Sequence, residues 1–231
     1  PNPKIYMPIG NCLMGHLRGP DSMAAAFLRS AGVRQMMGYV EVTWYGYMGW
    51  GCLDYFVEQP GRYTFNQAFF ANHHALIHRL ETCFPGSNDT GSSTRSIRPT
   101  ALAEKLRLGR QDVKGLLFDR DIVAFYGDPA WQAKMANGKN NWDQTLSRKG
   151  NEYSFVITPT AGPGSYMPVN ENGVQRGHRP FVEFFDRRLG EVRIVSGSEY
   201  DPVITDTFVL VPNPSPEQEA KSIKVVFREK D

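Results

Sequence analysis

A strand–helix–strand pattern limits what the first part of this chain can fold into. Lys4–Cys12 is a short, largely apolar run, and Val33–Val42 is a second run of the same kind. The Pro-Asp-Ser sequence at 20–22 predicts the start of a helix between them, and Gly32 predicts its end. Two strands joined by a helix of this length are expected to be parallel neighbours in one sheet. The first part of the chain is therefore predicted to be α/β.

The pattern changes in the second part of the chain. We expect a domain boundary within 137–152, where polar residues and glycine interrupt the apolar rhythm. This divides the chain into an α/β domain at 1–140 and a second domain at 150–231. The second domain contains short runs rich in β-branched and aromatic residues, separated by Gly, Pro, Asn and Asp: 153–158, 181–185, 191–196, 205–211 and 222–227. Such spacing predicts an all-β antiparallel sandwich.

Composition excludes several classes of function. The formal net charge of +2 is small and the basic residues are scattered, so we expect no nucleic-acid partner. No apolar run has the length that a membrane-spanning helix needs, so no membrane span is predicted. Cys12, Cys52 and Cys83 have no CxxC spacing, which predicts neither a zinc site nor a complete disulfide framework. No cofactor or metal is expected.

Cysteine and aromatic side chains follow the two predicted parallel strands. Ligands bind at the carboxyl ends of the strands in open parallel sheets, and this places Cys12 and the segment after Val42 at one rim. That segment reads "EVTWYGYMGWG" and interleaves aromatic residues, including Trp44 and Tyr45, with glycine. Such a loop can form the walls of a pocket, or it can be an aromatic cluster that covers the end of the sheet. Both interpretations stay open.

Three motifs in this order resemble one family of enzymes. "IYMPIGNCLMG" is similar to the cysteine block of the caspase, legumain and gingipain clan, with Cys12 and Gly15 at the matching positions and Asn11 where alanine is frequent. "TWYGYMGWG" follows the next strand, and "VAFYGDPAW" resembles the closing strand and GDP turn of the gingipain-like peptidases. The motifs cover about Ile5 to Trp131, and the remainder is similar in architecture alone.

The resemblance implies a specific fold and chemistry. It implies the C-terminal part of a caspase-like parallel sheet with flanking helices, followed by an immunoglobulin-like sandwich. It makes Cys12 the nucleophile of a secreted or cell-surface cysteine endopeptidase, and it places Gly15, Trp44 and Tyr45 at the site that binds the peptide or protein substrate. The simpler interpretation of Cys12 is a buried structural cysteine.

The position of histidine departs from the family pattern. In this clan the catalytic histidine precedes the cysteine, and no histidine precedes Cys12 here. We therefore expect an upstream segment or a second chain to complete the catalytic domain and supply the general base. His16 lies close in sequence to Cys12, whereas His74 and His78 are spaced for one face of a helix. The alternative function is a catalytically inactive, peptidase-like module that binds a protein or glycan.

Overall fold

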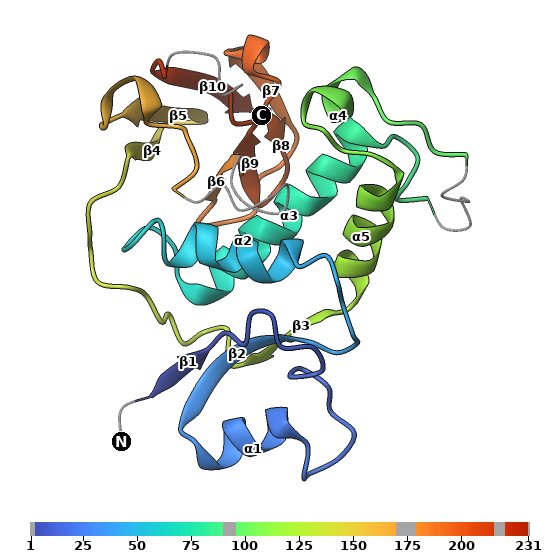
Figure 1. Ribbon diagram of the computed structural model, residues 1–231. Coiled ribbons are helices and arrows are strands. Elements are labelled where there is room, and N and C mark those ends of the chain that lie inside the picture. Colours follow the sequence, from blue (N-terminus) through green and yellow to red (C-terminus); the bar gives the residue numbers. More distant parts are fainter. Residues whose placement is uncertain (1–2, 90–95, 170–178, 215–219, 231) are drawn as a thin grey trace. The chain divides into compact units, whose positions relative to one another are not determined.

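The computed structural model describes residues 3–89, 96–169, 179–214 and 220–230 (Figure 1). These residues form two compact units, one ending at Gly138 and the other beginning at Lys139. The first unit contains β1 (Lys4–Tyr6), α1 (Met23–Ser30), β2 (Val33–Tyr39), α2 (Tyr47–Phe56), α3 (Phe65–Cys83), α4 (Ala101–Lys105), α5 (Arg110–Asp121) and β3 (Val123–Gly127). In the described part of the chain no helix is long and apolar enough to cross a membrane.

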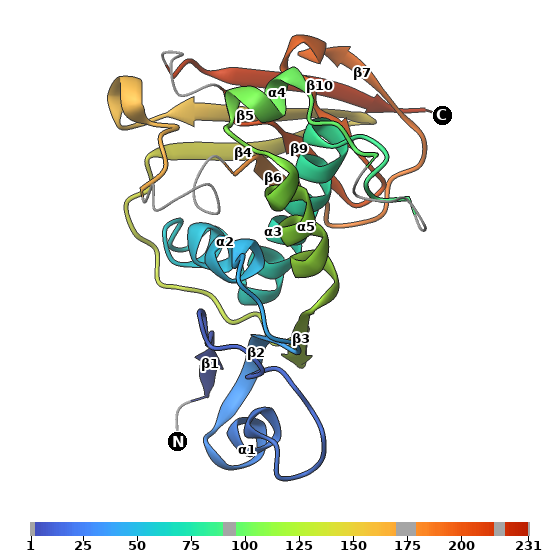
Figure 2. The same ribbon diagram turned by 45° about the vertical axis from the view of Figure 1, so that its right-hand side comes forward.

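The first unit is a three-stranded sheet with helices on both faces, in the order β1-β2-β3. β1 and β2 are parallel and are connected through α1, which confirms the predicted strand–helix–strand unit. β3 adds to the other side of β2 in the antiparallel direction. α1 covers one face of the sheet, whereas α2, α3 and α5 lie on the other (Figure 2).

Apolar side chains fill both faces of this sheet. On the α1 face, Ala24, Val33 and Met36 form a buried cluster, and Tyr6 stacks on Phe27 with their ring centroids 4.3 Å apart. On the opposite face, Phe125 of β3 packs against two phenylalanines of α3, Phe65 and Phe69. Residues that lie far apart in the sequence thus pack together in the core of the first unit.

The glycines of α2 make this helix look like a loop in the sequence. The residues "YMGWG" at 47–51, which end the predicted aromatic loop, form the first half of this buried helix instead. Its glycines allow neighbouring groups to approach closely. A Cβ on Gly51 would lie 1.8 Å from Asn72 Oδ1 of α3, and one on Gly49 would lie 3.2 Å from the Tyr39 hydroxyl. The second half of the aromatic-rich stretch is therefore part of a packed helix that covers the sheet, whereas Trp44 and Tyr45 precede that helix.

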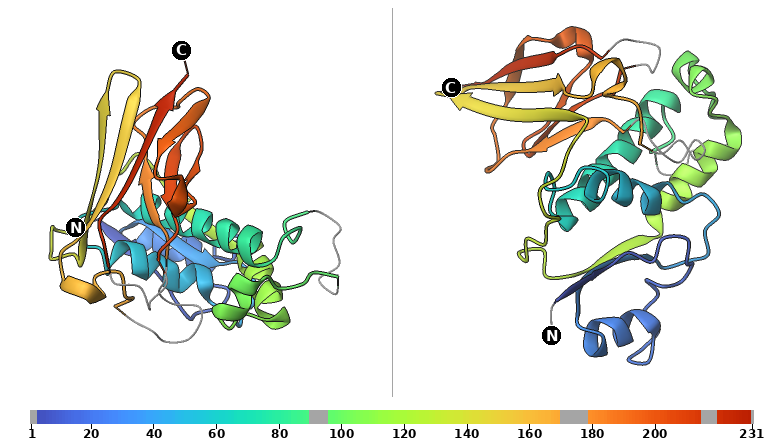
Figure 3. Two further views of the ribbon diagram at one scale, coloured as in Figure 1. Left: turned by 90° about the horizontal axis from the view of Figure 1, so that it is seen from above. Right: turned by 60° about the vertical axis from the view of Figure 1, so that its left-hand side comes forward.

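The second unit consists of two antiparallel sheets that share one core. Its strands are β4 (Trp142–Lys149), β5 (Glu152–Pro159), β6 (Phe181–Phe184), β7 (Val192–Ser196), β8 (Val203–Ile204), β9 (Phe208–Val211) and β10 (Ile223–Glu229). They form sheets of order β4-β5-β10-β7 and β6-β9-β8. Phe155 and Phe227 of one sheet and Phe181 and Val209 of the other belong to the same buried cluster. Figure 3 shows these strands in two further views.

The polar stretch that is predicted to hold the domain boundary contains a strand. β4 lies within 137–152 and pairs with β5 along its whole length. Its side chains alternate between partly buried and exposed positions, and several of them are polar. Pairing with β5 therefore orders a sequence whose composition is typical of a loop.

Candidate functional site

Cys12 lies in a turn beyond β1 and not at the end of the strand. The prediction of a strand over Lys4–Cys12 was wrong in its extent, because β1 ends at Tyr6. Pro8 has no N–H to donate to a ladder, and the Ile9 N–H donates to the Met7 carbonyl at 2.8 Å, which turns the chain away from the sheet. The partly exposed Cys12 therefore occupies a turn that follows the carboxyl end of β1.

Three hydrogen bonds hold this turn against the last residue of β2 and the segment that follows it. The Gly15 N–H donates to the Tyr39 carbonyl at 2.9 Å, and the Cys12 Sγ–H donates to the Thr43 carbonyl at 3.4 Å. The third joins His16 Nδ1 to the Val40 carbonyl at 2.6 Å. The structure thus brings Cys12 beside the 40–44 segment, as the parallel arrangement of the two strands predicts.

Leu13, directly after Cys12, has an unusual backbone conformation. Its φ is 64°, in the left-handed region that a leucine rarely occupies. Among the described residues, the N–H groups of Cys12, Leu13 and Met14 have no hydrogen-bond acceptor. Successive free N–H groups beside a left-handed residue provide donors for an anion. The turn therefore presents a thiol together with unused backbone donors.

Trp44 and Tyr45 face different environments. The side chain of Trp44 is 64% exposed and stacks on Phe118 of α5, with ring centroids 5.3 Å apart. Tyr45 is 6% exposed; its ring packs against Gly115 and its hydroxyl donates to Asp112 Oδ1 at 3.0 Å. Burial raises the pKa of Tyr45, with Asp112 adding to the effect. The two neighbours thus differ in exposure: the ring of Trp44 is open to solvent, whereas Tyr45 is a core residue.

His16 already uses both nitrogens of its ring. Arg18 Nε donates to His16 Nε2 at 2.9 Å, so Nδ1 carries the hydrogen that it donates to the Val40 carbonyl. This tautomer leaves neither nitrogen free to accept a proton from a thiol. The histidines of α3 lie on another element, and burial lowers the pKa of both His73 and His74.

Asp119 is the site residue that sequence reasoning missed. It is fully buried on α5, and its carboxylate accepts hydrogen bonds from Thr43 Oγ1 at 2.9 Å and from the Met48 N–H at 2.9 Å. Burial raises the pKa of Asp119, and the surrounding N–H and O–H donors oppose that effect. Because Met48 is in the first turn of α2, the carboxylate also lies at the positive end of that helix.

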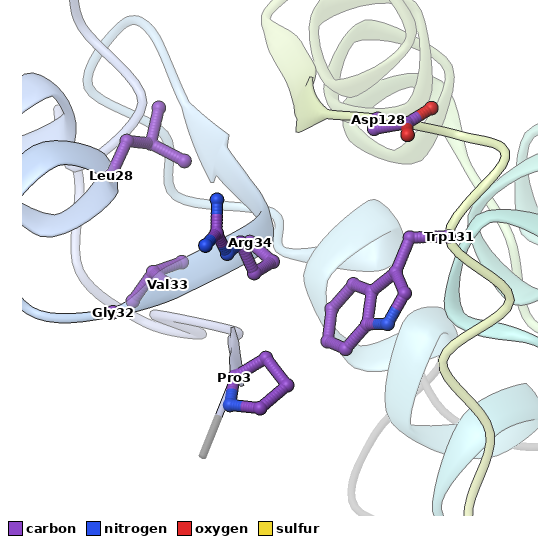
Figure 4. A pocket seen from close by; sticks show the side chains of 7 residues that line it. All are labelled: Pro3, Leu28, Gly32, Val33, Arg34, Asp128 and Trp131. Atoms are coloured by element: carbon purple, nitrogen blue, oxygen red, sulfur yellow. The ribbon is translucent and has the colours of Figure 1, made fainter. Parts of the chain in front are cut away.

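A pocket of about 560 Å³ lies at the opposite end of the sheet. It is lined by Pro3, Leu28, Gly32, Val33, Arg34, Asp128 and Trp131 (Figure 4). Gln35, fully buried in β2, donates from Nε2 to the carbonyls of Asp128 and Trp131 at 2.6 and 2.8 Å and fixes the turn after β3. The pocket lies at the starts of β1 and β2, whereas Cys12 follows their carboxyl ends.

Comparison with known proteins does not assign the chain to a group. No family model, curated protein or solved structure matches it. The geometry around Cys12 is therefore the basis for a functional assignment.

Proposed function

We propose that this protein is a cysteine endopeptidase of the gingipain-like type, with Cys12 as its nucleophile. One observation carries the proposal: a partly exposed thiol lies in a turn that is held at the carboxyl ends of two parallel strands, next to the exposed Trp44. The left-handed Leu13 and the free N–H groups beside it add support. A nucleophile on a sharp turn beside oxyanion donors is the arrangement that acyl transfer requires.

The chemistry follows from these groups. The Cys12 thiol loses its proton to a histidine, and the thiolate attacks the carbonyl carbon of the scissile bond. The amine leaves with a proton from that histidine, which leaves a thioester on Cys12. Water then hydrolyses the thioester and restores the thiol. We assign the stabilisation of the oxyanion in both steps to the unused N–H of Cys12.

The proposal includes a general base from outside these residues. His16 has both ring nitrogens engaged, so we assign the base to an upstream segment or a second chain that completes a caspase-like sheet. β1 is an edge strand of the described sheet, and an edge strand can pair with a strand from another segment or chain. If that strand is required, the 231 residues alone should self-associate in size-exclusion chromatography. A monodisperse, stable monomer would contradict this part of the proposal.

The resemblance extends the proposal to the second unit and to the location of the protein. We propose that the two sheets that share one core are an immunoglobulin-like sandwich and that the protein is secreted or displayed on the cell surface. The substrate is a peptide or protein chain that extends past Trp44.

The engagement of His16 also favours an alternative. A peptidase-like module without a base would bind a protein or glycan and not cleave it. The deciding experiment compares the protein, including any upstream segment, before and after Cys12→Ala, using a broad peptide library and a thiol-directed activity probe. Loss of cleavage and labelling with Cys12→Ala, but not with Cys83→Ala, supports the peptidase. Cys83 is a matched control because it is buried in α3. Inactivity of both proteins supports the binding module.

A further inference from the structure

The carboxylate of Asp119 holds three successive segments of the first unit together. It accepts hydrogen bonds from the Tyr39 hydroxyl at the end of β2 and from the Thr43 hydroxyl in the following loop, at 3.2 and 2.9 Å. It also accepts the Met48 N–H at the start of α2, at 2.9 Å. One carboxylate of α5 thus binds three points of the chain between Tyr39 and Met48.

The surroundings of Asp119 require a carboxylate. The Tyr39 hydroxyl accepts the Gly49 N–H at 2.9 Å, and the Thr43 hydroxyl accepts the Tyr45 N–H at 3.3 Å. Each hydroxyl therefore directs its single hydrogen to Asp119. A carboxylate accepts on both oxygens, whereas an amide would turn its NH₂ group toward at least one of these donors. The hydrogen bonds therefore require a carboxylate at position 119, and an amide of the same volume would not satisfy them.

This network reaches Cys12 through Thr43. The Thr43 side chain donates to Asp119 while its carbonyl accepts the Cys12 Sγ–H at 3.4 Å. The neighbour of Asp119 in α5, Phe118, stacks on Trp44, the neighbour of Thr43. Two adjacent residues of α5 thus fix the two adjacent residues that border the thiol.

We infer that Asp119 is the positioning residue of the Cys12 site and acts on the thiol through Thr43. The inference rests on the proposed function for its catalytic consequence, whereas its effect on the thiol can be measured without any substrate. Asp119 touches neither substrate nor the reacting atoms. Its replacement should alter the reactivity of Cys12 because the Thr43 carbonyl would no longer be held against the sulfur.

A double-mutant cycle tests the inference. The variants are Asp119→Asn, Thr43→Val and the pair, and the readout is the rate at which iodoacetamide alkylates Cys12 in the folded protein, followed by mass spectrometry of the Cys12 peptide. We expect each single variant to change this rate by about tenfold and the double variant to add nothing further. Additive effects, or rates equal to that of the unchanged protein, would overturn the inference. Val113→Ala, a buried change on the same helix, should leave the rate unchanged, and a comparable change in this control would also overturn it.

Two further comparisons keep the result interpretable. If Asp119→Asn does not fold, Thr43→Ser and Thr43→Val replace it: the serine keeps the hydroxyl and should preserve the rate, whereas the valine should not. Equal rates for these two variants would overturn the inference. Coupled effects on alkylation in a protein that cleaves no peptide would uphold the inference and contradict the proposed function. If peptide cleavage depends on Cys12 but the effects of Asp119→Asn and Thr43→Val on alkylation are additive, the proposed function is upheld and the inference is contradicted.

Discussion

Gly15 and Gly38 lie with their backbones in direct contact. A Cβ on Gly15 would be 2.4 Å from the Gly38 carbonyl oxygen, and one on Gly38 would be 2.7 Å from the Gly15 nitrogen. The Tyr126 hydroxyl of β3 also donates to the Gly15 carbonyl at 2.6 Å. Gly15 therefore anchors the Cys12 turn to the middle of the sheet. Its observed contacts are those of close packing, and its predicted place at the substrate stays a prediction.

Replacement of Gly15 should loosen this anchor. We expect Gly15→Ala to lower the free energy of unfolding by about 1–3 kcal/mol, because the new methyl group meets backbone atoms that have little freedom to move. Gly19→Ala is the matched control, since no atom lies within 4 Å of a Cβ at that position. Urea unfolding of both variants measures the difference. Equal stabilities would contradict the close contact.

The two neighbouring aromatic residues at 44 and 45 should respond differently to substitution. Tyr45→Phe removes the hydroxyl bond to Asp112 and should lower the free energy of unfolding by about 1 kcal/mol, with no effect on peptide binding. Trp44→Ala removes an exposed ring and should weaken peptide binding with a smaller loss of stability. Urea unfolding and the KM for a peptide substrate separate the two effects. A raised KM for Tyr45→Phe would show that Tyr45 contributes to peptide binding.

His74 makes the stability of the first unit sensitive to acid. Burial lowers the pKa of His74 from 6.5 to about 4. Between these values the unfolded chain binds a proton that the folded chain refuses, so the free energy of unfolding should fall as the pH drops from 6.5 toward 4. Urea midpoints measured across this range should show the slope, and His74→Gln should make it shallower. An unchanged slope would exclude His74 as its source.

Glu229 gives the second unit a different acid response. Arg187 pairs with Glu229, the Gly190 N–H donates to it at 2.7 Å, and together they lower the pKa of Glu229 from 4.5 to about 2. The stability from this lowered pKa is present above pH 4.5 and is lost as the pH falls through about 2. Glu229→Gln should remove this part of the pH dependence, and Arg187→Gln should reduce it. Unaltered acid unfolding curves for both variants would contradict the assignment.

The sequence predicts elements well where apolar residues follow one period. The helix at 23–30 follows from the Pro-Asp-Ser start at 20–22 and the stop at Gly32. In the structure a capping box formed by Thr64 and Gln67 begins the long helix at Phe65. Apolar periodicity does not predict α5, because Gly115 and Asp119 occupy its buried face, where a helix normally has apolar residues. Periodicity records burial only when the buried groups are apolar.

The candidate site was predictable in part for a related reason. The pairing of β1 with β2 brings Cys12 near Thr43 and Trp44, and this follows from topology. The role of Asp119 depends on donors supplied by other segments of the fold, so no local pattern around it indicates its function. An acidic residue on the apolar side of a helix is the one sequence signal that could have drawn attention to it.

The buried amide of Gln35 and the hydroxyl of Tyr39 connect β2 to both ends of the sheet. Through Gln35 the strand holds the turn that bears Trp131, and through Tyr39 it joins the network around Asp119. A substitution in β2 that alters one end of the sheet is therefore expected to alter the other end as well. A library that varies the loops around Cys12 should keep Val33–Tyr39 constant, because a change in this one strand would disturb the pocket beside Arg34 as well.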